Sequence, residues 1–322
     1  MGLLLLQMIV GFCLLALGAH TFIQGARRIA RLAQVPPVIV GIVLVGLGTS
    51  FPELAVSFIA AFKGHMMVSI GNVVGSNITN MGLVLGLTAM VVPLQVVSDV
   101  MRYDMPAYLV VMVLVGVLFY AGQLSRWSGV LLLLLLFCYL FWLLQRAWRA
   151  RPQDYDHHVE RLDAKHNTWF AAISLWVFGL VMVLFSAHGL VSGAVRLAQH
   201  FHWSELVIGL TIVAVGTALP ELAATLLSAF HQEHDIALGN VIGSNIFNLL
   251  AVLAMPALFS PKALPAHLFS RDYAVMVAFS LVLVLMIYLP RRHLIGRLSG
   301  LALLSGFMLY MTYLFRFYLS VT

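Results

Sequence analysis

The chain has 322 residues, of which 62% are hydrophobic and only 9% are charged, and its formal net charge is +6. A soluble globular domain has roughly a quarter of its residues charged, so this composition and a mean hydropathy of +1.00 exclude the soluble classes. The basic residues lie at helix ends and in loops, so the positive charge indicates membrane topology and no nucleic-acid partner. We therefore predict an all-α polytopic membrane protein.

Ten apolar runs are long enough to cross a hydrocarbon core of about 30 Å, which takes about 20 helical residues. In chain order they cover residues 3–23, 38–62, 68–92, 105–121, 127–145, 169–190, 206–230, 236–259, 273–290 and 299–319. The first run has no basic segment before it, so we expect a retained helix and not a signal peptide. Cys13 and Cys138 lie inside apolar runs and imply no disulfide framework.

The second run contains the segment Gly-Thr-Ser-Phe-Pro-Glu, which ends at Glu53. Pro52 has no N–H, so it frees the carbonyl of Gly48 four residues earlier. Thr49 and Ser50 add hydroxyl oxygens beside that carbonyl. An ionisable side chain at the centre of a span is costly and is by default functional. The segment predicts a broken helix whose oxygens line a buried site.

The third run has polar residues every four positions, which places them on one face of a helix. These residues are Asn72, Ser76 and Asn80, with Asn77 close by. Their amide and hydroxyl oxygens are neutral hard ligands, and interhelical hydrogen bonding is the alternative role. Gly71 and Gly75 form a Gly-x-x-x-Gly spacing that allows close helix packing.

A polar linker at residues 146–168 separates the first five runs from the last five. Twelve Lys and Arg residues lie in loops on the side of this linker, and six lie on the side of the N-terminus. Under the positive-inside rule, both termini face outward and the linker is cytoplasmic. We expect a bacterial inner membrane as the location.

The second half of the chain repeats the first. Residues 209–248 match residues 41–80 at a constant offset of 168, with 18 identities in 40 positions and no gap, which marks an internal duplication. Five helices per copy is an odd number, so the second copy enters the membrane from the opposite side. We therefore predict two inverted five-helix repeats, 1–145 and 169–322, as in transporters that work by alternating access.

The second copy also repeats the candidate site. The equivalent residues are Gly216, Thr217, Glu221, Asn240, Ser244, Asn245 and Asn248. Two carboxylates with amide, hydroxyl and carbonyl oxygens, and no thiolate or thioether, suit Ca²⁺ or Na⁺ and not a transition metal. Two carboxylates neutralise one Ca²⁺, and competition between cations for them produces antiport.

The paired motifs GTSFPE…GNVVGSN and GTALPE…GNVIGSN resemble the two α-repeats of the sodium/calcium exchangers, especially the short bacterial members of the calcium:cation antiporter superfamily. The resemblance covers nearly the whole chain. It implies ten helices, with helices 2, 3, 7 and 8 forming the ion site and helices 1 and 6 sliding across it as the gate. It also implies that Glu53 and Glu221 hold Ca²⁺. The implied oxygen ligands for Na⁺ are Thr49, Ser50, Thr217, Ser76 and Ser244, and the implied central helix positions are Asn80 and Asn248.

Two positions depart from the family pattern. Asn248 stands where exchangers commonly have Asp, and Ala218 stands where they have Ser. The site then carries at most two negative charges and has one hydroxyl fewer, which leaves the Na⁺ stoichiometry and the counter-ion open. Neighbouring carboxylates also disfavour full ionisation, so Ca²⁺/H⁺ exchange stays the alternative to Ca²⁺/Na⁺ exchange.

An intramembrane enzyme and a cation channel are the two other function classes that the sequence can be tested against. An intramembrane metalloprotease would need a motif such as His-Glu-x-x-His, which the sequence does not contain, so we expect no enzyme and no resident cofactor. A cation channel is the stronger rival and would show passive flux that needs no counter-ion. The expected partners are the transported ions and the lipid bilayer, with no obligatory protein partner.

Overall fold

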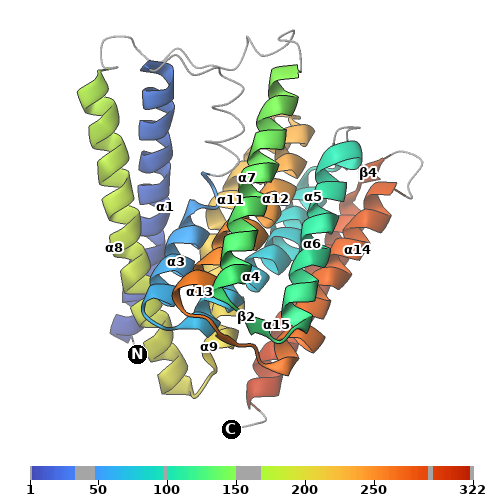
Figure 1. Cartoon of the computed structure of the whole chain (residues 1–322). Coiled ribbons are helices and arrows are strands. Elements are labelled where there is room, and N and C mark those ends of the chain that lie inside the picture. Colours follow the sequence, from blue (N-terminus) through green and yellow to red (C-terminus); the bar gives the residue numbers. More distant parts are fainter. Residues whose placement is uncertain (1, 33–47, 97–99, 150–167, 289–292, 320–322) are drawn as a thin grey trace.

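The computed structural model describes residues 2–32, 48–96, 100–149, 168–288 and 293–319. Long helices stand side by side, and the start of α1 and the end of α15 lie on the same side of the molecule (Figure 1). The α-helices are α1 (Gly2–Leu32), α3 (Phe51–Phe62), α4 (Met66–Thr79), α5 (Gly86–Val91), α6 (Met105–Tyr120), α7 (Arg126–Arg149), α8 (Trp169–Phe201), α9 (Glu205–Ile208), α10 (Ala214–Thr217), α11 (Leu219–Phe230), α12 (His234–Phe247), α13 (Ala254–Phe259), α14 (Ala274–Tyr288) and α15 (Arg297–Leu319). Short π-helical turns interrupt them at η2 (Asn80–Leu85), η3 (Val100–Asp104), η5 (Gly209–Val213), η6 (Asn248–Val252) and η7 (Leu268–Tyr273).

Eight helical segments of the described chain are long and apolar enough to span a membrane, and a bent pair makes a ninth. The bent pair joins Glu205–Thr217 to Leu219–Phe230 at 42°, as the Pro break in the seventh run predicts. Of the second run, the described part is α3, and residues 38–47 lie outside the described ranges. The predicted all-helical membrane fold is confirmed.

Two spans form the centre of the bundle. Met66–Val91 and Ile236–Phe259 are each 83% buried within the protein, whereas no other continuous span exceeds 39%. The outer helices expose large apolar side chains such as Val113, Phe185 and Leu309. These side chains are suited to face lipid, so the polar residues of the two central spans are shielded from the bilayer by protein.

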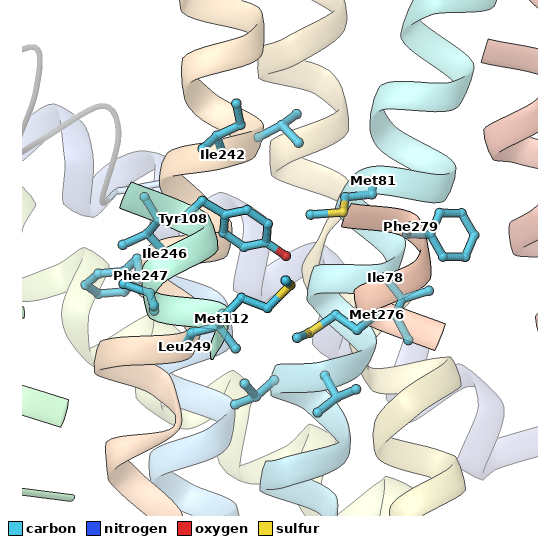
Figure 2. Close-up of a cluster of buried hydrophobic side chains, with 14 of the residues drawn as sticks. Ile78, Met81, Tyr108, Met112, Ile242, Ile246, Phe247, Leu249, Met276 and Phe279 are labelled. Atoms are coloured by element: carbon cyan, nitrogen blue, oxygen red, sulfur yellow. The ribbon is translucent and has the colours of Figure 1, made fainter. Parts of the chain in front are cut away.

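The core between the central spans is apolar and sulfur-rich. Figure 2 shows Ile78 and Met81 facing Ile242 and Ile246, with Tyr108 between them. The Tyr108 hydroxyl is fully buried and lies 2.8 Å from Ser280 Oγ. This bond satisfies the one polar atom that Tyr108 brings into the core.

Helices α1 and α8 pack closely and run antiparallel, which Figure 1 shows at the left of the bundle. The contacting pairs are Gly11 with Leu190, Gly18 with Val183, Gly25 with Trp176, and Gly179 with Phe22. A Cβ at Gly25 would lie only 2.4 Å from the Trp176 backbone nitrogen, so glycine is required there. Gly179 and Leu190 are the repeat equivalents of Gly11 and Phe22, so the first and last of these contacts are related by the duplication.

Four two-residue strands, which the sequence analysis did not predict, also tie the halves together. β1 (Leu94–Gln95) pairs with β4 (Leu294–Ile295), and β2 (Gln123–Leu124) pairs with β3 (Lys262–Ala263). β1 and β3 are 168 residues apart, the offset of the duplication. Each pair of strands therefore joins one half of the chain to the other, with β1 and β2 from the first half and β4 and β3 from the second.

Candidate functional site

The two Pro-Glu segments begin helices in the middle of the protein. Helix α3 begins after Ser50 and α11 begins after Ala218, and both have Pro in their first turn. Glu53 and Glu221 occupy the first turns of these helices. The positive end of a helix dipole stabilises a nearby carboxylate, which offsets part of the cost of burying each charge.

Every predicted site side chain is buried. The exposed fraction is 0% for both Glu53 and Glu221, and it reaches no more than 8% for the others. The buried set is Thr49, Ser50, Glu53, Asn72, Ser76, Asn77, Asn80, Thr217, Glu221, Asn240, Ser244, Asn245 and Asn248. The polar stripe therefore faces the interior of the protein and not lipid.

Four hydrogen bonds connect the site residues of one half to those of the other. Ser50 Oγ donates to Glu221 Oε1 at 3.2 Å, and Asn80 Nδ2 donates to Asn245 Oδ1 at 3.1 Å. The other two are Thr49 Oγ1 to Asn240 Oδ1 at 3.1 Å and Thr217 Oγ1 to Asn72 Oδ1 at 3.2 Å. The residues that the sequence placed in two separate blocks thus form one cluster.

Many oxygens in this cluster have no hydrogen-bond partner in the protein. Of thirteen buried side-chain polar atoms without a partner among the described residues, nine belong to predicted site residues. The oxygens are Glu53 Oε1 and Oε2, Glu221 Oε2, Asn77 Oδ1, Asn80 Oδ1, Ser244 Oγ and Asn248 Oδ1. Buried polar atoms are usually paired, so this concentration distinguishes the cluster from the rest of the interior.

The carbonyl of Gly48 is not fully released. It accepts a hydrogen bond of 3.4 Å from the backbone N–H of Phe51. Its second lone pair stays available to another partner. On the other half, Phe12 of α1 packs directly on Gly216, where a Cβ would lie 2.0 Å from the ring. Helix α1 therefore contacts the break in the seventh span.

Both central helices change geometry at equivalent asparagines. Asn80 begins η2 and Asn248 begins η6. A π-helical turn inside an α-helix is frequent at functional sites, and here it occurs at the two positions that the resemblance implied to be central.

The sequence analysis missed two residues, Ser57 and Thr225. Asn72 Nδ2 donates to Ser57 Oγ at 2.9 Å, and Asn240 Nδ2 donates to Thr225 Oγ1 at 3.0 Å. Ser57 and Thr225 are 168 residues apart and both carry a hydroxyl, so the duplication itself was the signal that could have found them. They lie one helical turn beyond each Glu.

The described residues contain no group of three or more His, Cys, Asp or Glu side chains that would hold a metal ion. The donors of the cluster are carboxylate, amide and hydroxyl oxygens from both halves of the chain, and one of the spans that carry them is bent by 42°. A buried, oxygen-rich cluster beside a broken membrane span is typical of transporters of small cations.

Comparisons with known proteins identify the family. The model of the sodium/calcium exchanger protein family matches residues 3–145 and 171–316. The putative antiporter CaxA of Alkalimonas amylolytica is 42% identical over 95% of this chain and 97% of its own length. The inner membrane protein YrbG of Escherichia coli is 37% identical over 96% and 95%, and the sodium/calcium exchanger MaX1 of Methanosarcina acetivorans is 31% identical over 96% and 98%.

A solved structure of the sodium-calcium exchanger NCX_Mj superimposes with a TM-score of 0.66 at 32% sequence identity, and covers 97% of this chain and 99% of its own. The chain belongs to the sodium/calcium exchanger family. The resemblance stated from the motifs is confirmed, and the protein is an integral membrane antiporter of the cation/Ca²⁺ class.

Proposed function

We propose that the protein exchanges Ca²⁺ for Na⁺ by alternating access at a single site built on Glu53 and Glu221. The observation that carries this proposal is the set of buried, unpartnered oxygens around the two carboxylates. A hard cation would satisfy several of these oxygens at once, which a hydrogen-bond donor of the protein does not do. Two carboxylates also match the charge of one Ca²⁺.

The proposed ligands differ in their roles. Glu53 and Glu221 supply the charge, and Asn80, Asn248 and Ser244 supply neutral oxygens. Thr49, Ser50, Thr217, Ser76 and the carbonyls of Gly48 and Gly216 complete the set for Na⁺. Asn72, Asn240, Asn77 and Asn245 stay in the proposal as members of the cluster, although their amides already make hydrogen bonds.

A second candidate function is Ca²⁺/H⁺ exchange. The observation that favours it is the asymmetry at position 218: the equivalent of Ser50 is Ala218, so this position offers Glu53 no hydroxyl like the one that Ser50 gives Glu221. A site with one hydroxyl fewer, and with Asn at 248, has fewer ligands for several Na⁺ ions. A proton needs no such coordination shell.

The membrane orientation belongs to the same proposal. Two inverted repeats, 1–145 and 169–322, would place both termini outside and residues 146–168 in the cytoplasm of a bacterial inner membrane. Cysteine-accessibility labelling of a tag at either terminus and of a cysteine at position 155 in intact cells would test it. Labelling of position 155 and not of the termini would overturn this orientation.

The deciding experiment is uptake of radiolabelled Ca²⁺ into liposomes that contain the purified protein. Uptake is followed under an outward Na⁺ gradient, an outward H⁺ gradient, and no gradient. Uptake driven by Na⁺ alone supports the proposal, and uptake driven by H⁺ alone supports the second candidate. Non-saturating uptake without a gradient would favour a channel, and no uptake would exclude Ca²⁺ as the substrate.

A further inference from the structure

We propose that Thr225 and Ser57 are positioning residues that orient the cation ligands of the opposite repeat through Asn240 and Asn72. This inference rests on the proposed function, because it takes Thr49 and Thr217 as cation ligands. Each hydroxyl starts a chain of two hydrogen bonds. We call the chain Ser57–Asn72–Thr217 the first relay and the chain Thr225–Asn240–Thr49 the second relay.

In the first relay the orientation of the amide is fixed by chemistry. Asn72 Nδ2 lies 3.1 Å from the backbone carbonyl of Glu53, and a carbonyl can only accept a hydrogen bond. The Nδ2 end of Asn72 therefore faces Glu53 and Ser57, and the Oδ1 end faces Thr217. The hydrogen bond between Thr217 Oγ1 and Asn72 Oδ1, at 3.2 Å, can then be donated only by Thr217.

The consequence for the cation follows from the number of lone pairs. A hydroxyl that gives its single proton to an amide oxygen keeps both lone pairs for other partners. Those lone pairs are what a hard cation needs. If the amide turned round, its Nδ2 group would point at the threonine, which would then have to accept a hydrogen bond and would lose ligand capacity.

In the second relay the amide nitrogen has fewer hydrogen-bond partners than in the first. Thr225 is the one described partner of Asn240 Nδ2, at 3.0 Å, whereas Asn72 Nδ2 has both Ser57 and the Glu53 carbonyl. Loss of Thr225 should therefore disturb the site more than loss of Ser57.

Both relays cross between the repeats. The hydroxyl and the Asn belong to one half of the chain, and the threonine that they orient belongs to the other. Thr225 and Ser57 are themselves fully buried and lie a full helical turn past the carboxylates, outside the cluster of unpartnered oxygens. They act on the cation through another residue and need not touch it.

The test uses the full-length protein in liposomes and compares Thr225→Val, which removes the hydroxyl and keeps the shape, with Thr225→Ser, which keeps the hydroxyl. We expect Thr225→Val to raise the half-saturating Na⁺ concentration for Ca²⁺ exchange about tenfold, the scale of one hydrogen bond, with a smaller change in the maximal rate. Thr225→Ser should restore the wild-type value. Ser57→Ala should raise the half-saturating concentration about threefold or less, since the Glu53 carbonyl still holds Asn72.

Double variants test whether the effect travels along the relay. The effects of Thr225→Val and Thr49→Val should combine to less than their product, because both remove the same ligand orientation. The effects of Thr225→Val and Thr217→Val should multiply, because these residues belong to different relays. Equal coupling to both threonines would indicate general loosening of the site and would overturn the inference.

Failure of this inference is separable from failure of the proposed function. If Glu53→Gln abolishes uptake and Thr225→Val leaves the half-saturating concentration unchanged, the relay is wrong and the site stands. If Thr225→Ser is as impaired as Thr225→Val, the hydroxyl is not the active group and the relay is also wrong. If Thr49→Val and Thr217→Val leave the half-saturating Na⁺ concentration unchanged, the threonines are not Na⁺ ligands and the Na⁺ ligand set of the proposed function fails with the relay.

Discussion

The two repeats share a backbone plan but surround their carboxylates differently. Glu221 accepts a hydrogen bond from Ser50 of the other half, whereas the hydroxyl that acts on Glu53 is that of Thr217, which makes its own hydrogen bonds to Asn72 and Ala214. The cause is one substitution within the duplication, since Ala218 stands at the equivalent of Ser50. Two almost identical motifs therefore give one carboxylate that accepts a side-chain hydrogen bond and one that accepts none in the described structure.

The central asparagines differ in the same way. Asn80 donates to Asn245 across the repeats, but both amide atoms of Asn248 are without a partner. In these two pairs of equivalent positions, Glu221/Glu53 and Asn80/Asn248, the side chain of one member makes a hydrogen bond and that of the other does not. The comparison teaches that sequence symmetry sets where the ligands lie, and that single side chains decide how tightly each one is held.

The largest effect is expected when either carboxylate is neutralised. Glu53→Gln or Glu221→Gln should lower Ca²⁺ uptake by at least about 100-fold, because removing one partner of a buried charge pair costs about 3–5 kcal/mol. Radiolabelled uptake into liposomes measures the loss, and an unchanged elution profile in size-exclusion chromatography checks the fold. Wild-type uptake in either variant would show that the two carboxylates do not form the site.

The asparagine pair gives the next largest effect, on stability. Asn80→Asp removes the donor of the bond to Asn245 and sets two acceptors against each other, so the free energy of unfolding should fall by about 1–3 kcal/mol. Asn248→Asp breaks no hydrogen bond and should be better tolerated. Denaturant titration of both variants in detergent checks the order, and equal destabilisation would contradict the asymmetry.

The sequence alone located most of the site, because the duplication marks it twice. Glu53, Glu221 and the Asn–Ser stripes could be identified from the cost of burying polar groups in lipid, and the same argument gave the helical fold. Which orientation each amide takes could not be predicted, since it depends on contacts such as that of Asn72 with the Glu53 carbonyl. Ser57 and Thr225 were missed because each is a single hydroxyl in an apolar helix, so that only their equivalence in the duplication could have pointed to them.

Other features needed tertiary structure for a different reason. The pairing of β1 with β4 joins residues about 200 positions apart through two residues each, and so short a strand has no periodicity to detect. The close approach of Phe12 to Gly216 depends on how α1 lies across the bundle. Local pattern determines that a helix forms, and packing determines what the helix covers.

Restoring the missing hydroxyl should make the two carboxylates more alike. Ala218→Ser places a donor opposite Glu53, as Ser50 is opposite Glu221, and should lower the half-saturating Na⁺ concentration for Ca²⁺ efflux by about fivefold to tenfold. Ser50→Ala should change it in the opposite direction by a similar factor. Efflux from Ca²⁺-loaded liposomes over a series of external Na⁺ concentrations measures both, and the double variant tests whether the asymmetry can be moved from one repeat to the other.

The smallest effect is expected at two equivalent positions, Lys63 at the end of α3 and His231 at the end of α11. Lys63 Nζ donates to Ser192 Oγ at 2.8 Å and lies 3.2 Å from His188 Nε2 on α8, and its pKa is lowered by burial. At the equivalent positions, His231 is exposed and its side chain has no hydrogen bond in the described structure, and His20 instead contacts Gln24 on its own helix.

Lys63→Ala should therefore lower the free energy of unfolding by about 1 kcal/mol or less, as is usual for exposed polar pairs, while His231→Ala should leave it unchanged within error. Denaturant titration of the two alanine variants compares the halves directly. A larger loss of unfolding free energy with His231→Ala than with Lys63→Ala would mean that the end of α11 is held more tightly than the end of α3. That result would contradict the asymmetry of the hydrogen bonds at these two positions.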